Sequence, residues 1–264
     1  MNSILTAVIL VAVIAFIVGL VLAAASVLID VPMDEKTQAI LDLLPGANCG
    51  ACGYSGCSGY AAALSKGEAH PGLCSPGGQM AADAISELVG VESVKNLPKA
   101  SVVHCSGSDC NTSKKTLYQG VNSCMAANQL FGGMGECPYG CIGFGDCVAS
   151  CEYGAINVDN GVADINPDLC RACGKCADVC PKHLIRVEPV SPHAVVKCSN
   201  CDKGVYTRES CKVGCLGCMK CVKVCPLGAI KIENFHAVID SEKCNGCRKC
   251  VEVCTQQIIQ LIGT

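Results

Sequence analysis

The stretch from Cys170 to Pro181 reads CRACGKCADVCP, and the stretch from Cys215 to Pro226 reads CLGCMKCVKVCP. Both space four cysteines as C-x2-C-x2-C-x3-C and end on proline. A third stretch, from Cys244 to Cys254, keeps this spacing but is followed by Thr255. Three thiolates from one tight loop can bind three corners of a cubane iron–sulfur cluster, and a distant cysteine supplies the fourth ligand. The three runs therefore predict [4Fe–4S] sites.

Disulfides and zinc are the alternative uses of so many cysteines. The chain has 26 cysteines among 264 residues, a density typical of a fold built around them. Only 4% of the residues are aromatic and tryptophan is absent, so an ordinary aromatic-rich core is excluded. Secreted disulfide scaffolds do not require the repeated spacing seen here, and zinc sites usually take their ligands as separated pairs. Iron–sulfur binding fits the runs better than either.

A fourth run, from Cys137 to Cys151, has longer gaps, C-x3-C-x5-C-x3-C. The repeat structure of the chain supports it as a site. The segments 152–169 and 226–243 each hold 18 residues between two cysteine runs, and they contain the matching strings GAINV and GAIKI. A turn and a second apolar stretch follow each string, which predicts a β-hairpin between the cluster loops. The chain therefore carries two copies of a two-cluster ferredoxin unit.

In such a unit the fourth cysteine of each run binds the other cluster. This rule predicts four ligand sets. They are Cys137, Cys141, Cys147 with Cys180; Cys170, Cys173, Cys176 with Cys151; Cys215, Cys218, Cys221 with Cys254; and Cys244, Cys247, Cys250 with Cys225.

A fifth site is predicted upstream, in a stretch rich in Gly and Ala. Its ligands are Cys49, Cys52, Cys57 and Cys74. Glycines let the backbone wrap closely around a bulky ligand, so we expect another [4Fe–4S] cluster, with a four-thiolate zinc site as the alternative. The segment from Gln79 to Leu97 reads as a helix that follows this site, with Met80, Ala84, Ile85, Leu88 and Val89 facing inward.

Six cysteines remain outside these five sets: Cys105, Cys110, Cys124, Cys198, Cys201 and Cys211. The string VVHCS at 102–106 parallels VVKCS at 195–199, so Cys105 and Cys198 stand at equivalent places before the two units. The simplest set for a sixth cluster is Cys105, Cys124, Cys198 and Cys211. Buried free thiols are the alternative. We therefore expect five [4Fe–4S] clusters, with a sixth left open.

The N-terminal segment predicts one membrane-spanning helix. Residues 4–29 carry no charge, and about 20 apolar residues span a bilayer. A cleaved signal peptide is the alternative, but no Lys or Arg precedes the apolar run and the run is too long. Lys36 favours a cytoplasmic location for the residues after the helix. The expected architecture is α+β, with a transmembrane helix over 1–30, a four-cysteine domain over 31–100, and ferredoxin-like units over 101–190 and 191–264.

Charge divides the chain unevenly. Residues 30–168 carry 6 Lys/Arg and 15 Asp/Glu, a balance of −9, whereas residues 170–254 carry 14 and 8, a balance of +6. The basic part is also rich in cysteine, so nucleic-acid binding is not expected. Seven of its basic residues flank the cysteine runs: Arg171, Lys175, Lys182, Lys220, Lys223, Arg248 and Lys249. They either balance the negative charge of the clusters or attract an acidic protein partner.

The order of these parts resembles the B subunit of the Rnf complex: one N-terminal membrane helix, a four-cysteine iron–sulfur domain, then ferredoxin-type domains. The motif CGACGYSGC at 49–57 is similar to the signature of that family, and the resemblance covers essentially the whole chain. The resemblance implies a single-pass protein of a bacterial or archaeal cytoplasmic membrane, with its cluster domains in the cytoplasm. It implies soluble ferredoxin as electron donor, the other membrane subunits of the complex as partners, and Na⁺ or H⁺ as the pumped ion.

The chain would then act as a subunit of a translocating ferredoxin:NAD⁺ oxidoreductase, in the EC 7.2.1 class. The sequence has no GxGxxG before a helix, no P-loop and no nucleophile–base arrangement, so we expect neither an NAD site nor catalytic residues in this chain. The main alternative is a membrane-tethered polyferredoxin that serves a hydrogenase or another dehydrogenase. A weaker alternative is a structural zinc protein without redox function.

Overall fold

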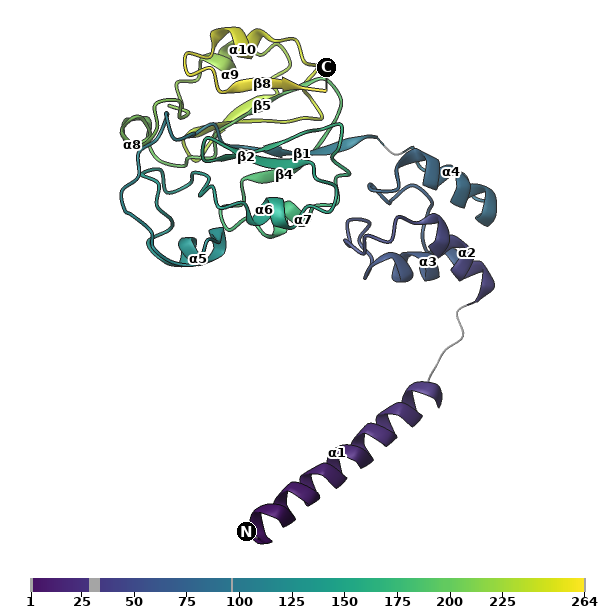
Figure 1. Cartoon of the computed structure of the whole chain (residues 1–264). Coiled ribbons are helices and arrows are strands. Elements are labelled where there is room, and N and C mark those ends of the chain that lie inside the picture. Colours follow the sequence, from purple (N-terminus) through teal and green to yellow (C-terminus); the bar gives the residue numbers. More distant parts are fainter. Residues whose placement is uncertain (1, 29–33, 96, 264) are drawn as a thin grey trace.

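The computed structural model describes residues 2–28, 34–95 and 97–263. Helix α1 (Asn2–Leu28) stands apart from the rest of the molecule in Figure 1. Its segment Ile4–Ala24 has a mean hydropathy of 3.2 over 21 residues, long and apolar enough to cross a bilayer. The expected N-terminal apolar helix is confirmed, whereas its expected end at Ile29 and the boundary at residue 30 lie outside the described residues.

Three short helices form a small N-terminal body: α2 (Glu35–Leu43), α3 (Cys57–Ser65) and α4 (Gly78–Val89). Their core contains Ile40, Tyr60, Leu64 and Ile85, each no more than 1% exposed. Alanines on α3 let the helices approach closely, so few large side chains fill this core. The loops between the helices carry the cysteines of the body.

The expected helix from Gln79 to Leu97 is shorter than predicted. Helix α4 ends at Val89 because Gly90 adopts a left-handed conformation with φ of 76°, which ends a helix favourably. The expected inward face is also partly wrong. Met80 is 85% exposed and Leu88 is 42% exposed, since α4 covers the body with one narrow edge only.

The rest of the chain forms two units with the same order of elements. The first unit contains β1 (Lys99–Val103), α5 (Cys124–Gln129), α6 (Asp146–Ala149), β2 (Ile156–Asp159), β3 (Val162–Ile165), α7 (Lys175–Asp178) and β4 (Ile185–Pro189). The second unit contains β5 (His193–Val196), α8 (Gly204–Ser210), α9 (Lys220–Val224), β6 (Ile230–Glu233), β7 (His236–Ile239), α10 (Lys249–Val253) and β8 (Ile259–Ile262). Figure 1 shows the two units packed side by side.

Each unit contains two antiparallel strand pairs. The hairpins β2–β3 and β6–β7 confirm the hairpins expected from the repeated strings. Asn160 and Gly161 have φ values of 47° and 78°, the positive values that a tight two-residue hairpin turn requires. Asn234 and Phe235 adopt the same kind of turn in the second unit. The other two pairs, β1–β4 and β5–β8, join the first strand of each unit to its last.

The cores of both units are built from small apolar side chains and cysteines. In the first unit Val103, Leu184 and Ile185 pack with Cys147 and Cys176, and all five are buried. The second unit has an equivalent core, in which cysteines again pack beside Val, Ile and Ala. Most of the thiols of the two units are therefore buried or half-buried, and several of them share these cores.

Candidate iron–sulfur sites

Site 1, in the N-terminal body, brings together the predicted set Cys49, Cys52, Cys57 and Cys74. Burial raises the pKa of the Cys74 thiol most. A hydrogen bond from the backbone of Gly77 lowers this pKa, and the nearby Cys57, Cys52 and Cys49 raise it. The four thiols therefore lie close enough together to interact, as the ligands of one bound cluster would.

Local hydrogen bonds hold the loops of site 1. The side chain of Asn48 accepts a bond of 2.9 Å from the backbone nitrogen of Cys57, and a Cβ at Gly56 would come within 2.9 Å of that same Asn48 oxygen. Glycine at position 56, with φ of 94°, is therefore required. The Tyr60 hydroxyl donates to the carbonyl of His70 at 2.8 Å and accepts from the nitrogen of Leu73 at 3.2 Å, which fixes the loop that leads into Cys74.

Site 2 gathers the predicted set Cys151, Cys170, Cys173 and Cys176. Burial raises the pKa of Cys176, a hydrogen bond with Ser101 lowers it, and the other three cysteines raise it. Strand β1 supplies donors to the sulfurs, because the Ser101 nitrogen lies 3.3 Å from the Cys170 sulfur. Such N–H···S contacts stabilise ligand sulfurs in iron–sulfur proteins and tune the cluster.

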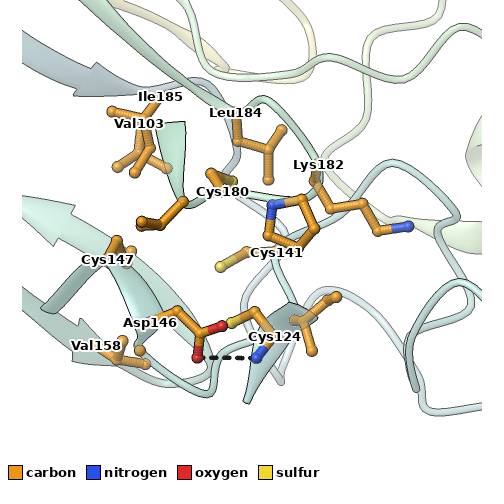
Figure 2. Close-up of a pocket in the computed structure, with 15 residues that line it drawn as sticks. Val103, Cys124, Cys141, Asp146, Cys147, Val158, Cys180, Lys182, Leu184 and Ile185 are labelled. Atoms are coloured by element: carbon orange, nitrogen blue, oxygen red, sulfur yellow. Dashed lines mark hydrogen bonds between the residues drawn. The ribbon is translucent and has the colours of Figure 1, made fainter. Parts of the chain in front are cut away.

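Site 3 differs from the predicted set in one ligand. Cys141, Cys147 and Cys180 surround a common space together with Cys124, and not with Cys137 (Figure 2). The space measures about 420 Å³ including its opening to solvent. Burial raises the pKa of Cys147 to about 12, and Cys141, Cys124 and Cys180 contribute to the rise.

The register of the repeat explains why Cys124 takes this place. Cys215 lies 74 positions after Cys141, and Cys221 lies 74 positions after Cys147. The middle cysteine of the second unit, Cys218, therefore corresponds to Phe144, which has no thiol. The ring of Phe144 packs 5.5 Å from the ring of Tyr118. The missing ligand comes instead from the segment before the run.

Site 5 and site 6 belong to the second unit. Site 5 brings together Cys215, Cys218, Cys221 and Cys254 around about 380 Å³ of space, as predicted. Burial raises the pKa of Cys221 to about 11, with Cys215, Cys218 and Cys254 adding to it. Site 6 contains Cys244, Cys247 and Cys250, and Cys225 packs in the same core. Burial raises the pKa of Cys250 most, and the nearby Cys244 and Cys247 raise it further.

A further group of four thiols, called site 4 here, lies where the two units meet. It consists of Cys105, Cys137, Cys198 and Cys211, which line one space of about 370 Å³. The sequence placed Cys124 in this group and Cys137 in site 3, and the structure exchanges the two. The cause is the C-x3-C-x5-C spacing, which carries Cys137 out of the tight loop and toward the second unit. Cys110 and Cys201 line none of the described pockets.

The six sites follow one another in a row. Cys49 of site 1 lies near Cys173 of site 2. Burial raises the pKa of Cys173 most, a backbone hydrogen bond from Lys175 lowers it, and the nearby Cys49 raises it. Sites 2 and 3 share the core of the first unit, and sites 5 and 6 share that of the second. Site 4 touches both neighbours, since Cys105 lies beside Cys141 of site 3 and Cys198 beside Cys215 of site 5.

The donor chemistry of the sites fits [4Fe–4S] clusters. Each site offers four thiols from at least two segments, with backbone N–H groups aimed at several of the sulfurs. In the described part of the chain no three Cys, His, Asp or Glu side chains converge on a point that suits one metal ion. A [4Fe–4S] cluster, when bound by such thiolates, supplies a one-electron redox couple.

Family models agree with this chemistry. A model described as a putative Fe–S cluster matches residues 44–76, which include site 1. A model of a 4Fe–4S dicluster domain matches residues 137–184 and 214–258, one in each unit. Together with the apolar helix α1, these features define an iron–sulfur electron-transfer protein with several [4Fe–4S] clusters and a membrane-type anchor.

Three relatives match almost the whole chain, and all three are B subunits of oxidoreductase complexes. The B subunit of a Na⁺-translocating ferredoxin:NAD⁺ oxidoreductase complex from Acetobacterium woodii is 39% identical over 92% of this chain and 74% of its own length. A proton-translocating counterpart from Clostridium ljungdahlii is 38% identical, over 92% and 87%. The B subunit of an ion-translocating oxidoreductase complex from Methanosarcina acetivorans is 36% identical, over 93% and 94%. The chain belongs to the family of Rnf-complex B subunits, which confirms the resemblance seen in the sequence.

Proposed function

We propose that the chain accepts electrons from reduced soluble ferredoxin and relays them into an ion-translocating ferredoxin:NAD⁺ oxidoreductase complex, as a subunit of a translocase of the EC 7.2.1 class. Its other partners are the membrane subunits of that complex. Sites 1, 2, 3, 5 and 6 hold five [4Fe–4S] clusters. The observation that carries the proposal is the row of thiol sites, with one end exposed and basic and the other end in the body that follows α1 along the chain.

The exposed end lies in the second unit. Cys218 of site 5 and Cys247 of site 6 are both exposed, in contrast to the buried cysteines of the same runs. Four exposed basic side chains flank them: Lys220, Lys223, Arg248 and Lys249. A positive rim around sites close to solvent favours docking of an acidic electron carrier and speeds its encounter. This supports the second of the two uses that the sequence left open for these basic residues.

The opposite end of the row is site 1. It lies in the body of α2, α3 and α4, which follows α1 along the chain. Electrons that enter at sites 5 and 6 therefore leave near the anchor, where membrane subunits would receive them. Lys36, just after the apolar helix, favours a cytoplasmic position for all the sites.

The chain's own residues bind and tune the redox centres. Cysteine thiolates bind iron, and backbone groups such as the nitrogens of Ser101 and Ala237 donate to ligand sulfurs at 3.3 and 3.4 Å. The apolar cores bury some of the thiols, such as Cys147, Cys176 and Cys221, and leave most of the others half-buried. Burial and N–H···S contacts act in opposite directions on reduction potential, so each site acquires its own value.

The test is the rate at which reduced ferredoxin reduces the anaerobically purified full chain, followed by stopped-flow absorbance. We expect the rate to fall steeply with ionic strength. Replacing Lys220, Lys223, Arg248 and Lys249 with Gln should lower it by about fivefold or more at low salt.

The matched control replaces two exposed lysines of the N-terminal body, K66Q and K95Q. These changes should leave the rate within about twofold of the unmodified chain, because their charges lie at the other end of the row. If the rate is insensitive to salt and to the four substitutions around sites 5 and 6, ferredoxin does not enter there and the proposal is wrong.

A further inference from the structure

The cysteines of site 4 come in two equivalent pairs, one from each unit. Cys105 follows β1 and Cys198 follows β5, within the parallel strings VVHCS and VVKCS. Cys211 lies 74 positions after Cys137, the same offset that relates the cluster runs of the two units. Site 4 therefore lies at the junction of the two units, and each unit alone supplies half of it.

Two of the four cysteines of site 4, Cys105 and Cys211, are buried between the units, and Cys137 and Cys198 are half-buried. Cys105 and Cys211 are each 8% exposed. A Cβ placed on Gly107 would lie 3.5 Å from the Cys105 sulfur and 3.7 Å from the Cys211 sulfur, so both sulfurs border the same small volume. Burial raises the pKa of Cys105 to about 12 and that of Cys198 to about 11, with Cys137 contributing to each.

Three of the four sulfurs of site 4 have a hydrogen-bond donor. The nitrogen of Gly107 donates to Cys105 at 3.4 Å, and the nitrogen of Cys215 donates to Cys198 at 3.3 Å. Burial raises the pKa of the Cys211 thiol, and the neighbouring backbone of Val213 and Gly214 lowers it. Donors aimed at sulfur are the environment of thiolate ligands, whereas buried free thiols need none.

The donor to the Cys137 sulfur is the side-chain amide of Asn200. Asn200 is only 2% exposed, and its Nδ2 lies 3.4 Å from the Cys137 sulfur. Its Oδ1 accepts from the nitrogen of Asp202 at 2.7 Å and from the hydroxyl of Thr207 at 3.3 Å. These two bonds fix the orientation of the amide, so that its NH₂ group points at sulfur.

Hydrogen bonds between the units frame the site. The hydroxyl of Thr112 donates to the carbonyl of Ser210 at 2.8 Å, and the nitrogen of Lys212 donates to the carbonyl of Asn111 at 2.9 Å. On the other side, the Ser199 hydroxyl donates to a backbone carbonyl of the first unit at 3.1 Å. The two halves of site 4 are thus held in register by contacts that do not involve the thiols.

We propose that Cys105, Cys137, Cys198 and Cys211 hold a sixth [4Fe–4S] cluster, bound across the junction of the two units. Four thiolates that line one space, three of them with a hydrogen-bond donor, complete the ligand set of a cubane without any residue from the other five sites. Binding releases four protons, one from each thiol. The site connects site 3 to site 5, and without it the row is interrupted between the two units. The inference is independent of which protein donates electrons.

The first test is the iron and acid-labile sulfide content of the anaerobically purified full chain. Six cubanes give about 24 iron atoms per chain, and five give about 20. This count needs no variant, so it does not depend on whether a substituted chain folds. About 24 supports the sixth cluster, and about 20 overturns it.

The second test assigns the ligands by paired substitutions. C105A should remove about four iron atoms, and C105A combined with C137A should remove the same four, because both belong to site 4. C105A combined with C124A should remove about eight, since Cys124 belongs to site 3. The reverse pattern, with about eight lost for the first pair and about four for the second, overturns the grouping.

The matched control is C110A, which replaces an exposed cysteine close to Cys105 in the sequence. It should leave the iron content and the electron paramagnetic resonance spectrum of the reduced chain unchanged. The C105A spectrum should lose the signal of one cluster and keep those of the other sites. An unchanged iron content and spectrum in C105A would contradict the proposal even if electron transfer from ferredoxin proceeds normally.

Discussion

The carboxylate of Asp146 accepts a hydrogen bond of 2.9 Å from the backbone nitrogen of Cys124, a residue that precedes it by 22 positions (Figure 2). The same carboxylate accepts from the nitrogen of Met125 at 3.0 Å and from the hydroxyl of Ser123 at 2.9 Å. Burial opposes ionisation of this group, but the three donors outweigh it and lower the pKa of Asp146. Asp146 therefore anchors the start of α5, and it does so from the residue next to Cys147.

Replacing Asp146 with Asn should free Cys124 from site 3. A neutral amide accepts these bonds less strongly than a carboxylate, and losing a cap of this kind costs about 1–2 kcal/mol. We expect a lower midpoint of thermal unfolding and a loss of up to about four iron atoms. D178N, at an exposed position in α7, is the control and should change neither. Full iron content in D146N would show that Cys124 does not depend on this anchor.

Replacing Phe144 with Cys should make Cys124 dispensable. Position 144 corresponds to Cys218, so a thiol there restores the regular C-x2-C-x2-C spacing from Cys141 to Cys147. We expect C124A alone to lack about four iron atoms and C124A with F144C to regain them. The measurement is iron per chain, with F144Y as a control that supplies no thiol. Failure of F144C to restore iron, in a chain that keeps its other clusters, would show that the two cysteine runs are not in register.

Replacing Tyr60 with Phe should loosen site 1 alone. The change removes the two hydrogen bonds that the hydroxyl makes to the loop before Cys74, each worth about 1 kcal/mol. We expect faster loss of one cluster on exposure to a chelator, followed by absorbance, while the ferredoxin units keep theirs. Y54F is the control, because that ring lies 5.4 Å from Tyr60 in the same body. Equal rates for the two variants would contradict a role for the Tyr60 hydroxyl.

Glu188 should make the docking of the two units sensitive to acid. Its carboxylate lies 3.6 Å from the Nε2 of His104 and 3.7 Å from the Nε2 of His193, and it joins one histidine of each unit. The His104 side chain lowers the pKa of Glu188 most, burial opposes this, and the charges of both histidines lower it further. A lowered pKa in the folded state means that the carboxylate stabilises the fold above its unfolded pKa of 4.5.

This stabilisation should be lost as the pH falls below 4.5 and through the lowered value of the folded state. We expect E188Q to be less stable than the unmodified chain at pH 7 and the difference to shrink toward zero in acid. Chemical unfolding at several pH values measures it, with E209Q, at an exposed position in α8, as the control. A difference that stays constant with pH would mean that the charge of Glu188 contributes nothing.

Much of this architecture could be predicted from the sequence because cluster ligation demands fixed spacing. The runs at Cys170 and Cys215 predicted groups of cysteines that the structure brings together, and the repeated GAINV and GAIKI strings predicted the hairpins. Cys124 could not be assigned in this way. Its place depends on a contact with Asp146 across a long loop, and loop folding leaves no periodic trace in a sequence. One signal was available, the offset of 74 positions, which sets Cys137 opposite Cys211 and leaves Phe144 where a ligand should stand.

The division of site 4 into two equal halves has a consequence for how the chain assembles. Each unit alone carries only one pair of these thiols, such as Cys105 and Cys137 in the first unit. Because the short connection at 190–192 holds both units in one polypeptide, the meeting of the two halves is an intramolecular event at a high local concentration. Completion of the site therefore requires that both units have folded and docked.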